Sequence, residues 1–223
     1  MPRERYQESL EELRADVLAM GETVTGRLDE SLEAVERHDE SLARAVIDGD
    51  EEVNETYLRL EDRCVDLFAL QQPVAGDLRF VTASFKVITD LERVGDLAVN
   101  LAQYVRGATR TVAPDAEIDE IARLARSLLD RSLSAYETGN ADACRAVADD
   151  DDEIDALCER ASQTVTRDLI GGSAGDAWDV ERLLDDVSRV LLTIRDLERV
   201  ADHAVNIAAR TLFMIENDPE LIY

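Results

Sequence analysis

Lysine is almost missing from this sequence. Lys86 is the only lysine among 24 basic residues, and 50 acidic residues bring the formal net charge of the 223-residue chain to -26. Such a field repels phosphate backbones and anionic lipid headgroups, so we expect neither a nucleic-acid partner nor binding to a membrane surface. An acid-rich, lysine-poor surface also suits a cytoplasm with molar salt, where screening suppresses self-repulsion, and we favour this interpretation of the charge.

Cysteine and histidine are too scarce for the common reactive and metal sites. Cys64, Cys144 and Cys158 form no CxxC pair, which predicts buried free thiols in a reducing compartment. His38 and His203 are the only histidines, and neither follows a glutamate at the Glu-x-x-His spacing of ferritin-like di-iron proteins. No signal peptide and no apolar run long enough to span a bilayer is visible, so we expect a cytoplasmic protein without membrane insertion.

Proline and glycine are also rare, with four and ten residues, which leaves room for long regular elements. Apolar residues recur at steps of three and four nearly everywhere, the period of an α-helix, and no convincing alternating strand is present. Breaker residues divide the chain into six helical segments; they lie near His38, Pro73, 107–114, Gly139 and 171–175, with Asp77 and Asp115 as expected N-caps. The sequence therefore predicts an all-α fold of six long helices.

The six segments form two sets of three. Residues 90–102 read DLERVGDLAVNLA and residues 196–208 read DLERVADHAVNIA, with ten of thirteen positions identical at a spacing of 106. Upstream, DEEVN at 50–54 matches DDEID at 151–155 at a spacing of 101. This internal duplication predicts two tandem, structurally repeated three-helix bundles, which we place at residues 1–110 and 111–223.

The duplicated motif carries a pair of carboxylates in each half. Glu92 and Asp96, and likewise Glu198 and Asp202, are four residues apart and so share one helix face. At 100° per residue, Glu198 lies roughly 40° from the centre of the apolar stripe of its helix. A carboxylate this close to the core needs a partner, because burying it unpaired is costly.

The upstream echo supplies further oxygen ligands. Asp50 and Asn54 in the first half, and Asp151 and Asp155 in the second, also have the i, i+4 spacing and belong to the helix expected to face the duplicated motif. Hard oxygen ligands favour iron, manganese, magnesium or calcium, although carboxylates also bind zinc. A network of ion pairs with arginine is the alternative explanation of the same pattern. We expect the second half to bind metal more tightly, because Asn54 replaces a charged ligand in the first.

These motifs resemble the PhoU family of phosphate-transport regulators. The family's E(D)xxxD pattern falls on Glu92/Asp96 and Glu198/Asp202, and QQPVAGDLR at 71–79 is similar to the family's segment between its second and third helices. The resemblance implies a cytoplasmic six-helix protein that restrains phosphate uptake through a Pst-type ABC transporter. It also implies iron or zinc on these carboxylates. The implied partners are a second copy in a homodimer, the transporter's ATPase subunit and, in bacteria, a sensor kinase.

Two other hypotheses concern different classes of protein. One is a helical, carboxylate-bridged metal enzyme, an oxidase or hydrolase, and the other is a metal-storage protein. Additional histidine ligands near Glu92 or Glu198 would favour the enzyme, and the sequence has none there. Because we find no nucleophile paired with a base and no cofactor-binding loop, we predict a non-enzymatic regulator.

Overall fold

The computed structural model describes residues 2–70, 75–105, 117–171, 177–219 and 221, and within these ranges every regular element is an α-helix. The first half contains α1 (Pro2–Arg37), α2 (Glu40–Asp48), α3 (Asp50–Leu70) and α4 (Ala75–Val105). The second half contains α5 (Ile118–Thr138), α6 (Ala141–Asp149), α7 (Asp151–Gly171) and α8 (Ala177–Glu216). The all-α, duplicated architecture predicted from the sequence is confirmed.

The predicted second and fifth helices are each divided into a short and a long helix. Gly49 separates α2 from α3 with φ -88° and ψ 0°, and Asp150 separates α6 from α7 with φ -83° and ψ -8°. The two breaks are equivalent in the duplication, since they are 101 residues apart. Because of these breaks, α3 begins at Asp50 and α7 begins at Asp151. The positive end of the helix dipole at each N-terminus favours these carboxylates in the first turn.

Some predicted helix ends differ from the observed ones. Asp77, expected as an N-cap, lies inside the first turn of α4, because the helix already begins at Ala75. Asp115, the other expected N-cap, and the boundary between residues 110 and 111 lie outside the described residues. The predicted stop at Gly139 is confirmed: α5 ends at Thr138 and Gly139 adopts a left-handed conformation.

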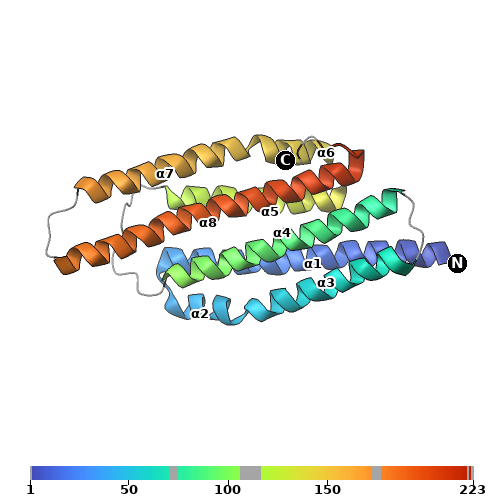
Figure 1. Ribbon diagram of the computed structural model, residues 1–223, viewed down its shortest axis with the longest axis horizontal. Helices are drawn as coiled ribbons and strands as arrows, with labels where there is room; N and C mark the ends of the chain where they lie inside the picture. Colours follow the sequence, from blue (N-terminus) through green and yellow to red (C-terminus); the bar gives the residue numbers. More distant parts are fainter. Residues whose placement is uncertain (1, 71–74, 106–116, 172–176, 220, 222–223) are drawn as a thin grey trace.

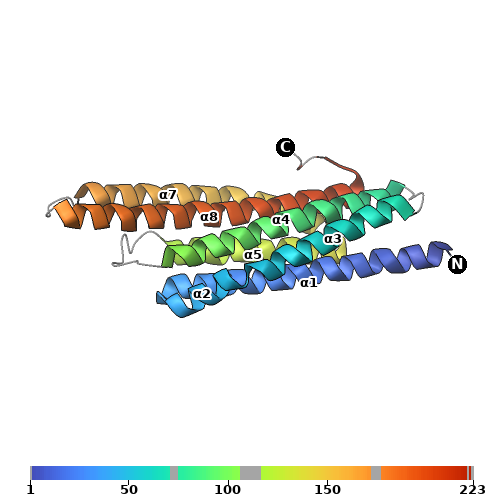
Figure 2. The same ribbon diagram turned by 60° about the horizontal axis from the view of Figure 1, so that its bottom comes forward.

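The two halves lie side by side with their long axes nearly parallel (Figures 1 and 2). α4 and α8 run antiparallel through the centre of the molecule and pack against each other, and α1 packs against α5. α3 and α7 lie on opposite outer edges, and among the described residues each contacts only helices of its own half. None of the described helices has an apolar stretch long enough to cross a bilayer.

One continuous apolar core joins the halves. The sequence predicts a modest core in each half, whereas most buried apolar side chains of α1, α4, α5 and α8 form a single cluster. A small separate cluster contains Ala34, Ala43, Val46, Ala102 and Val105. Leu91 of α4 and its counterpart Leu197 of α8 are 0% and 1% exposed, and both belong to the large cluster. Separating the halves would therefore expose apolar surface on all four helices, which is unfavourable in water.

The turns after α1 and α5 provide a stability prediction with an internal control. His38 and Gly139 occupy equivalent left-handed positions, with φ of 51° and 64°. Because a side chain is strained there and glycine is not, His38→Gly is expected to raise the free energy of unfolding by about 1 kcal/mol. Gly139→Ala is expected to lower it by a similar amount, since the added Cβ would meet no atom within 4 Å and only the backbone strain changes. Urea unfolding measures both; a destabilised His38→Gly would contradict the argument.

Candidate metal centre

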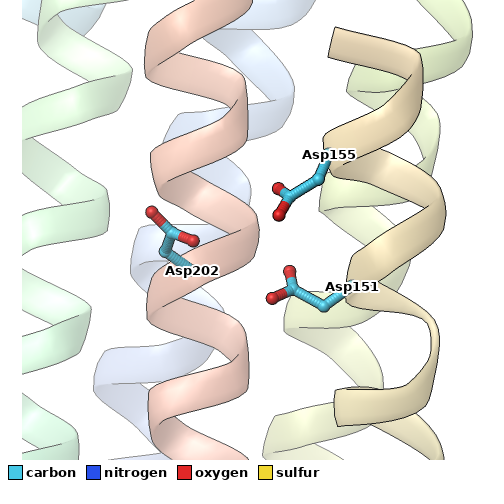
Figure 3. A group of neighbouring side chains, drawn as sticks. All are labelled: Asp151, Asp155 and Asp202. Carbon is cyan, nitrogen blue, oxygen red and sulfur yellow. The ribbon is translucent and has the colours of Figure 1, made fainter. Parts of the chain in front are cut away.

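Three aspartates from two helices converge in the second half. Asp151 and Asp155 lie one turn apart on α7, and Asp202 projects toward them from α8 (Figure 3). One carboxylate oxygen from each lies within 4.8 Å of the others. The break at Asp150 lets α7 start at Asp151, so the acid in its first turn points at α8. We refer to Asp151, Asp155 and Asp202 as the second cluster.

The electrostatics of the second cluster are unfavourable to its own charges. Burial, and then the nearby carboxylates of Asp155 and Asp202, raise the pKa of Asp151 to about 6. The pKa values of Asp202 and Glu198 are also raised, first by burial and then by Asp155. Like charges this close disfavour the ionised form unless a cation compensates them.

The donor set fits a hard cation. Asp151 Oδ1 is shielded from solvent, and among the described residues it has no hydrogen-bond partner. A buried oxygen without a hydrogen-bond donor costs free energy. A metal ion bound by the three carboxylates would remove that cost and would also offset the repulsion between them. Asp151, Asp155 and Asp202 would hold the ion, with Glu198 beside them. All three converging donors are oxygens, as iron, manganese and magnesium prefer.

A thiol lies next to the second cluster. Cys158 is 2% exposed, and its pKa is raised to about 12 by burial and then by Glu198, Asp155 and Asp202. Cys64 and Cys144 are also buried free thiols with pKa values near 11. The sequence prediction of buried free cysteines is confirmed, and their protonated state at neutral pH disfavours a nucleophilic role.

In the first half, Asp50, Asn54 and Asp96 correspond to the second cluster, and Glu92 corresponds to Glu198. We call the three carboxylates Asp50, Glu92 and Asp96 the first cluster, and their arrangement is different. Asn54 donates a hydrogen bond from Nδ2 to Asp50 Oδ2 at 3.0 Å. Arg93 lies 3.5 Å from both Glu92 and Asp96. The pKa values of Glu92 and Asp96 are raised, mainly by burial, and Arg93 partly offsets the rise. Here an amide and a guanidinium compensate the carboxylates.

The structure thus separates the residues that the sequence groups together. Of the His, Cys, Asp and Glu side chains that the structure describes, only those of the second cluster gather three possible ligand atoms within 4.8 Å. Asp50, Glu92 and Asp96 are neighbours without such convergence. In the first half Arg93 lies beside the carboxylates, whereas in the second half three carboxylate oxygens converge. Metal binding stays a prediction for both halves.

Two side chains of α8, those of His203 and Arg199, act electrostatically on carboxylates of both halves. His203 on α8 lies 2.9 Å from Asp90 on α4 and is only 17% exposed. Arg199, the counterpart of Arg93, lowers the pKa of Asp96 in the first half and of Asp202 in the second. The duplicated sequence DLERV contains this arginine directly after the motif glutamate in both halves. That position could have indicated from the sequence that the arginine lies near the carboxylates.

A duplicated helical bundle with carboxylate clusters on corresponding helices defines a repeat protein in which each half offers one acidic site. The model of the PhoU domain matches this chain twice, over residues 17–105 and 118–211, and the chain belongs to the PhoU family. Together the two matches cover most of the chain, and each includes one copy of the duplicated motif.

Relatives and solved structures agree with this assignment. A phosphate-specific transport system accessory protein PhoU homolog of Clostridium acetobutylicum is 31% identical over 218 residues, which are 96% of each chain. The phosphate-specific transport system accessory protein PhoU homolog 1 of Methanothermobacter thermautotrophicus is 29% identical, over 96% of this chain and 95% of its own length. The crystal structure of PhoU from Pseudomonas aeruginosa matches with a TM-score of 0.81 at 27% identity, covering 96% of this chain and all of that one.

Proposed function

We propose that this protein is a cytoplasmic accessory protein of a phosphate transport system and that it restrains phosphate uptake through a Pst-type ABC transporter. The observation that carries the proposal is the duplicated motif, present in both PhoU-domain matches of a chain that is similar to named transport accessory proteins over nearly its whole length. The PhoU family consists of regulatory accessory proteins, so the chain is not an enzyme.

The proposed function includes a metal ion, iron or zinc, at the second cluster. The support is the convergence of Asp151, Asp155 and Asp202 and the buried Asp151 Oδ1. Asp151 and Asp155 of α7 and Asp202 of α8 would hold the ion, which would supply positive charge to offset the repulsion between these carboxylates. The oxygen-only donor set favours iron over zinc, which more often takes nitrogen or sulfur ligands.

The proposed partners are a second copy of the chain in a homodimer and the ATPase subunit of the transporter. A sensor kinase is a further candidate if the protein also signals phosphate supply. Family membership supports these partners, because relatives are named as accessory proteins of a transport system. Co-purification of the tagged full-length chain with a phosphate-transporter ATPase tests the first step, and sedimentation analysis tests the homodimer.

Deleting the gene is expected to raise phosphate uptake in phosphate-rich medium, because the transporter loses its restraint. Uptake of radiolabelled phosphate by the deletion strain, the parent strain and a complemented strain is the measurement. The complemented strain should return to the parental rate. Parental uptake rates in the deletion strain, with cellular polyphosphate also unchanged, would reject the restraining role.

The raised pKa of Asp151 gives a pH prediction for the metal-free protein. The folded pKa of about 6 lies above the ordinary value of 3.8, so the folded state binds a proton more readily than the unfolded state. Stability therefore falls as pH rises from about 4 through 6, and the loss is complete above pH 6. Asp151→Asn mimics the protonated group. In protein freed of metal with a chelator, it is expected to raise the free energy of unfolding at pH 7.5 by on the order of 1 kcal/mol, after discounting for solvent screening. At pH 4 the two proteins should unfold alike; equal urea midpoints at pH 7.5 would contradict the prediction.

A further inference from the structure

The outer helix α3 carries large apolar side chains that face solvent. Leu58, Val65 and Phe68 are 58%, 53% and 37% exposed, and none of them belongs to the apolar core or packs against it. They are three of the five large apolar side chains that are exposed among the described residues. Their concentration on one helix distinguishes them from the single exposed apolar residues that are normal on protein surfaces.

The three side chains form one stripe. Leu58 and Val65 are seven residues apart and Phe68 follows three residues later, so at 100° per residue they lie on the same flank of the helix. The core-facing side of α3 is made by other residues, Leu60 and Cys64 among them, which are fully buried. The stripe is therefore additional to the face that holds α3 in the fold. We call Leu58, Val65 and Phe68 the α3 stripe.

The duplication shows that the fold does not require this stripe. On α7, which occupies the corresponding outer edge, Leu58 and Val65 are replaced by the exposed Glu159 and Thr166. Phe68 corresponds to Leu169, which is partly buried against the core and so serves a packing role. α7 packs against α8 although the corresponding flank of α7 is polar. Packing of the bundle therefore does not explain the exposed apolar side chains of α3.

A row of carboxylates borders the stripe. Glu55, Asp62 and Asp66 are exposed and lie on the neighbouring strip of the helix, at spacings of seven and four. α3 as a whole contains seven acidic residues and two arginines. The counterparts of Asp62 and Asp66 on α7 are Gln163 and Arg167, so the acidic border is also specific to α3.

We propose that the α3 stripe and its border of Glu55, Asp62 and Asp66 form a docking surface for an amphipathic helix of a partner protein whose apolar face is edged by lysine or arginine. The apolar side chains would supply buried area, and the opposite charges would fix orientation and speed association. The surface lies on the outer edge, away from the centre of the molecule where α4 and α8 pack (Figure 1), and it does not depend on metal binding.

Charge excludes the other occupants. Two copies of this surface placed face to face would bring the six border carboxylates together, and in each copy Arg63 is already engaged by Glu12 and Asp16. Nucleic acids and anionic membranes carry the same sign of charge as the border and would be repelled. A basic, amphipathic helix is the occupant that satisfies both the stripe and its border.

The test uses the full-length protein and a synthetic 18-residue helical peptide with a leucine face edged by lysines. Leu58→Glu/Val65→Thr gives α3 the residues of α7 at two exposed positions and should leave the helical content unchanged. It is expected to weaken peptide binding by about tenfold or more, measured by fluorescence anisotropy. Asp62→Gln/Asp66→Arg should also weaken binding and flatten its dependence on salt.

The reciprocal transfer is the matched control. Giving α7 the α3 residues, through Glu159→Leu, Gln163→Asp, Thr166→Val and Arg167→Asp, should create a second site and raise the stoichiometry from one peptide to two. The same peptide edged by glutamates should bind at least about tenfold more weakly than the lysine form. Two results would overturn the proposal: peptide binding that Leu58→Glu/Val65→Thr leaves intact, or a dimer of the wild-type chain that this variant converts to a monomer.

Discussion

Replacing Asp155 and Asp202 by asparagine is expected to lower the affinity of the protein for Fe²⁺ or Zn²⁺ by about 100-fold or more. These two carboxylates and Asp151 offer oxygens within 4.8 Å of one another, and the variant removes two of the three charges. Both asparagines keep similar volumes at exposed positions, so the helices should persist. Elemental analysis of protein purified without chelator, followed by titration calorimetry with each metal, measures the effect. Affinity should also fall below pH 6 in the wild type, as protons compete for the ligands.

The first half supplies the control for this prediction. Asp50→Asn/Asp96→Asn removes two carboxylates from the first cluster, where Asn54 and Arg93 already compensate the charge. This variant is expected to retain the metal content of the wild type. Equal metal in the wild type and the Asp155→Asn/Asp202→Asn variant would show that the second cluster is structural. In the otherwise wild-type chain, Asn54→Asp together with Arg93→Gln should move the first half toward metal binding, because it supplies the counterpart of Asp155 and removes the competing cation.

Asp196→Ala is expected to lower the free energy of unfolding by about 2–3 kcal/mol, because it breaks a buried polar network between the halves. The Asp196 side chain is completely buried on α8, and it accepts a hydrogen bond from the Tyr104 hydroxyl of α4 at 2.8 Å. Arg195 and Arg199 lie 3.2 and 3.5 Å from its Oδ1. Burial and this hydrogen bond raise the pKa of Tyr104 to about 12. Urea unfolding at pH 7.5 measures the loss.

Its motif counterpart Asp90 provides the comparison. Asp90 also faces the other half, where it contacts His203 at 2.9 Å, but its side chain is 14% exposed whereas that of Asp196 is completely buried. Asp90→Ala should therefore cost less than Asp196→Ala at pH 7.5, about 1 kcal/mol. A double-mutant cycle between Asp196→Ala and Tyr104→Phe should give a coupling free energy of about 1 kcal/mol. Unfolding midpoints for Asp196→Ala that match the wild type would show that the network does not stabilise the contact between α4 and α8.

Local patterns in the sequence were sufficient for the helices and the duplication. The three- and four-residue spacing of apolar side chains is a property of one helix and needs no partner to be recognised. The breaks at Gly49 and Asp150 were missed for the same reason: the apolar period continues across each break, and Asp150 is no helix breaker by composition. Only the backbone angles at these residues show that two helices replace one.

The candidate site divides in the same way. The sequence by itself determined which carboxylates share a helix face, because the i, i+4 spacing fixes Asp151 beside Asp155 and Glu198 beside Asp202. It also identified Asn54 as the departure that distinguishes the first half. The distance between α7 and α8, and hence the convergence of Asp151, Asp155 and Asp202, depends on how the helices pack, and only the tertiary structure decided it. Packing likewise decided that Asp196 is buried against Tyr104 instead of exposed. Sequence spacing fixes neighbours along one helix, whereas neighbours across helices are set by the shared core of the two halves.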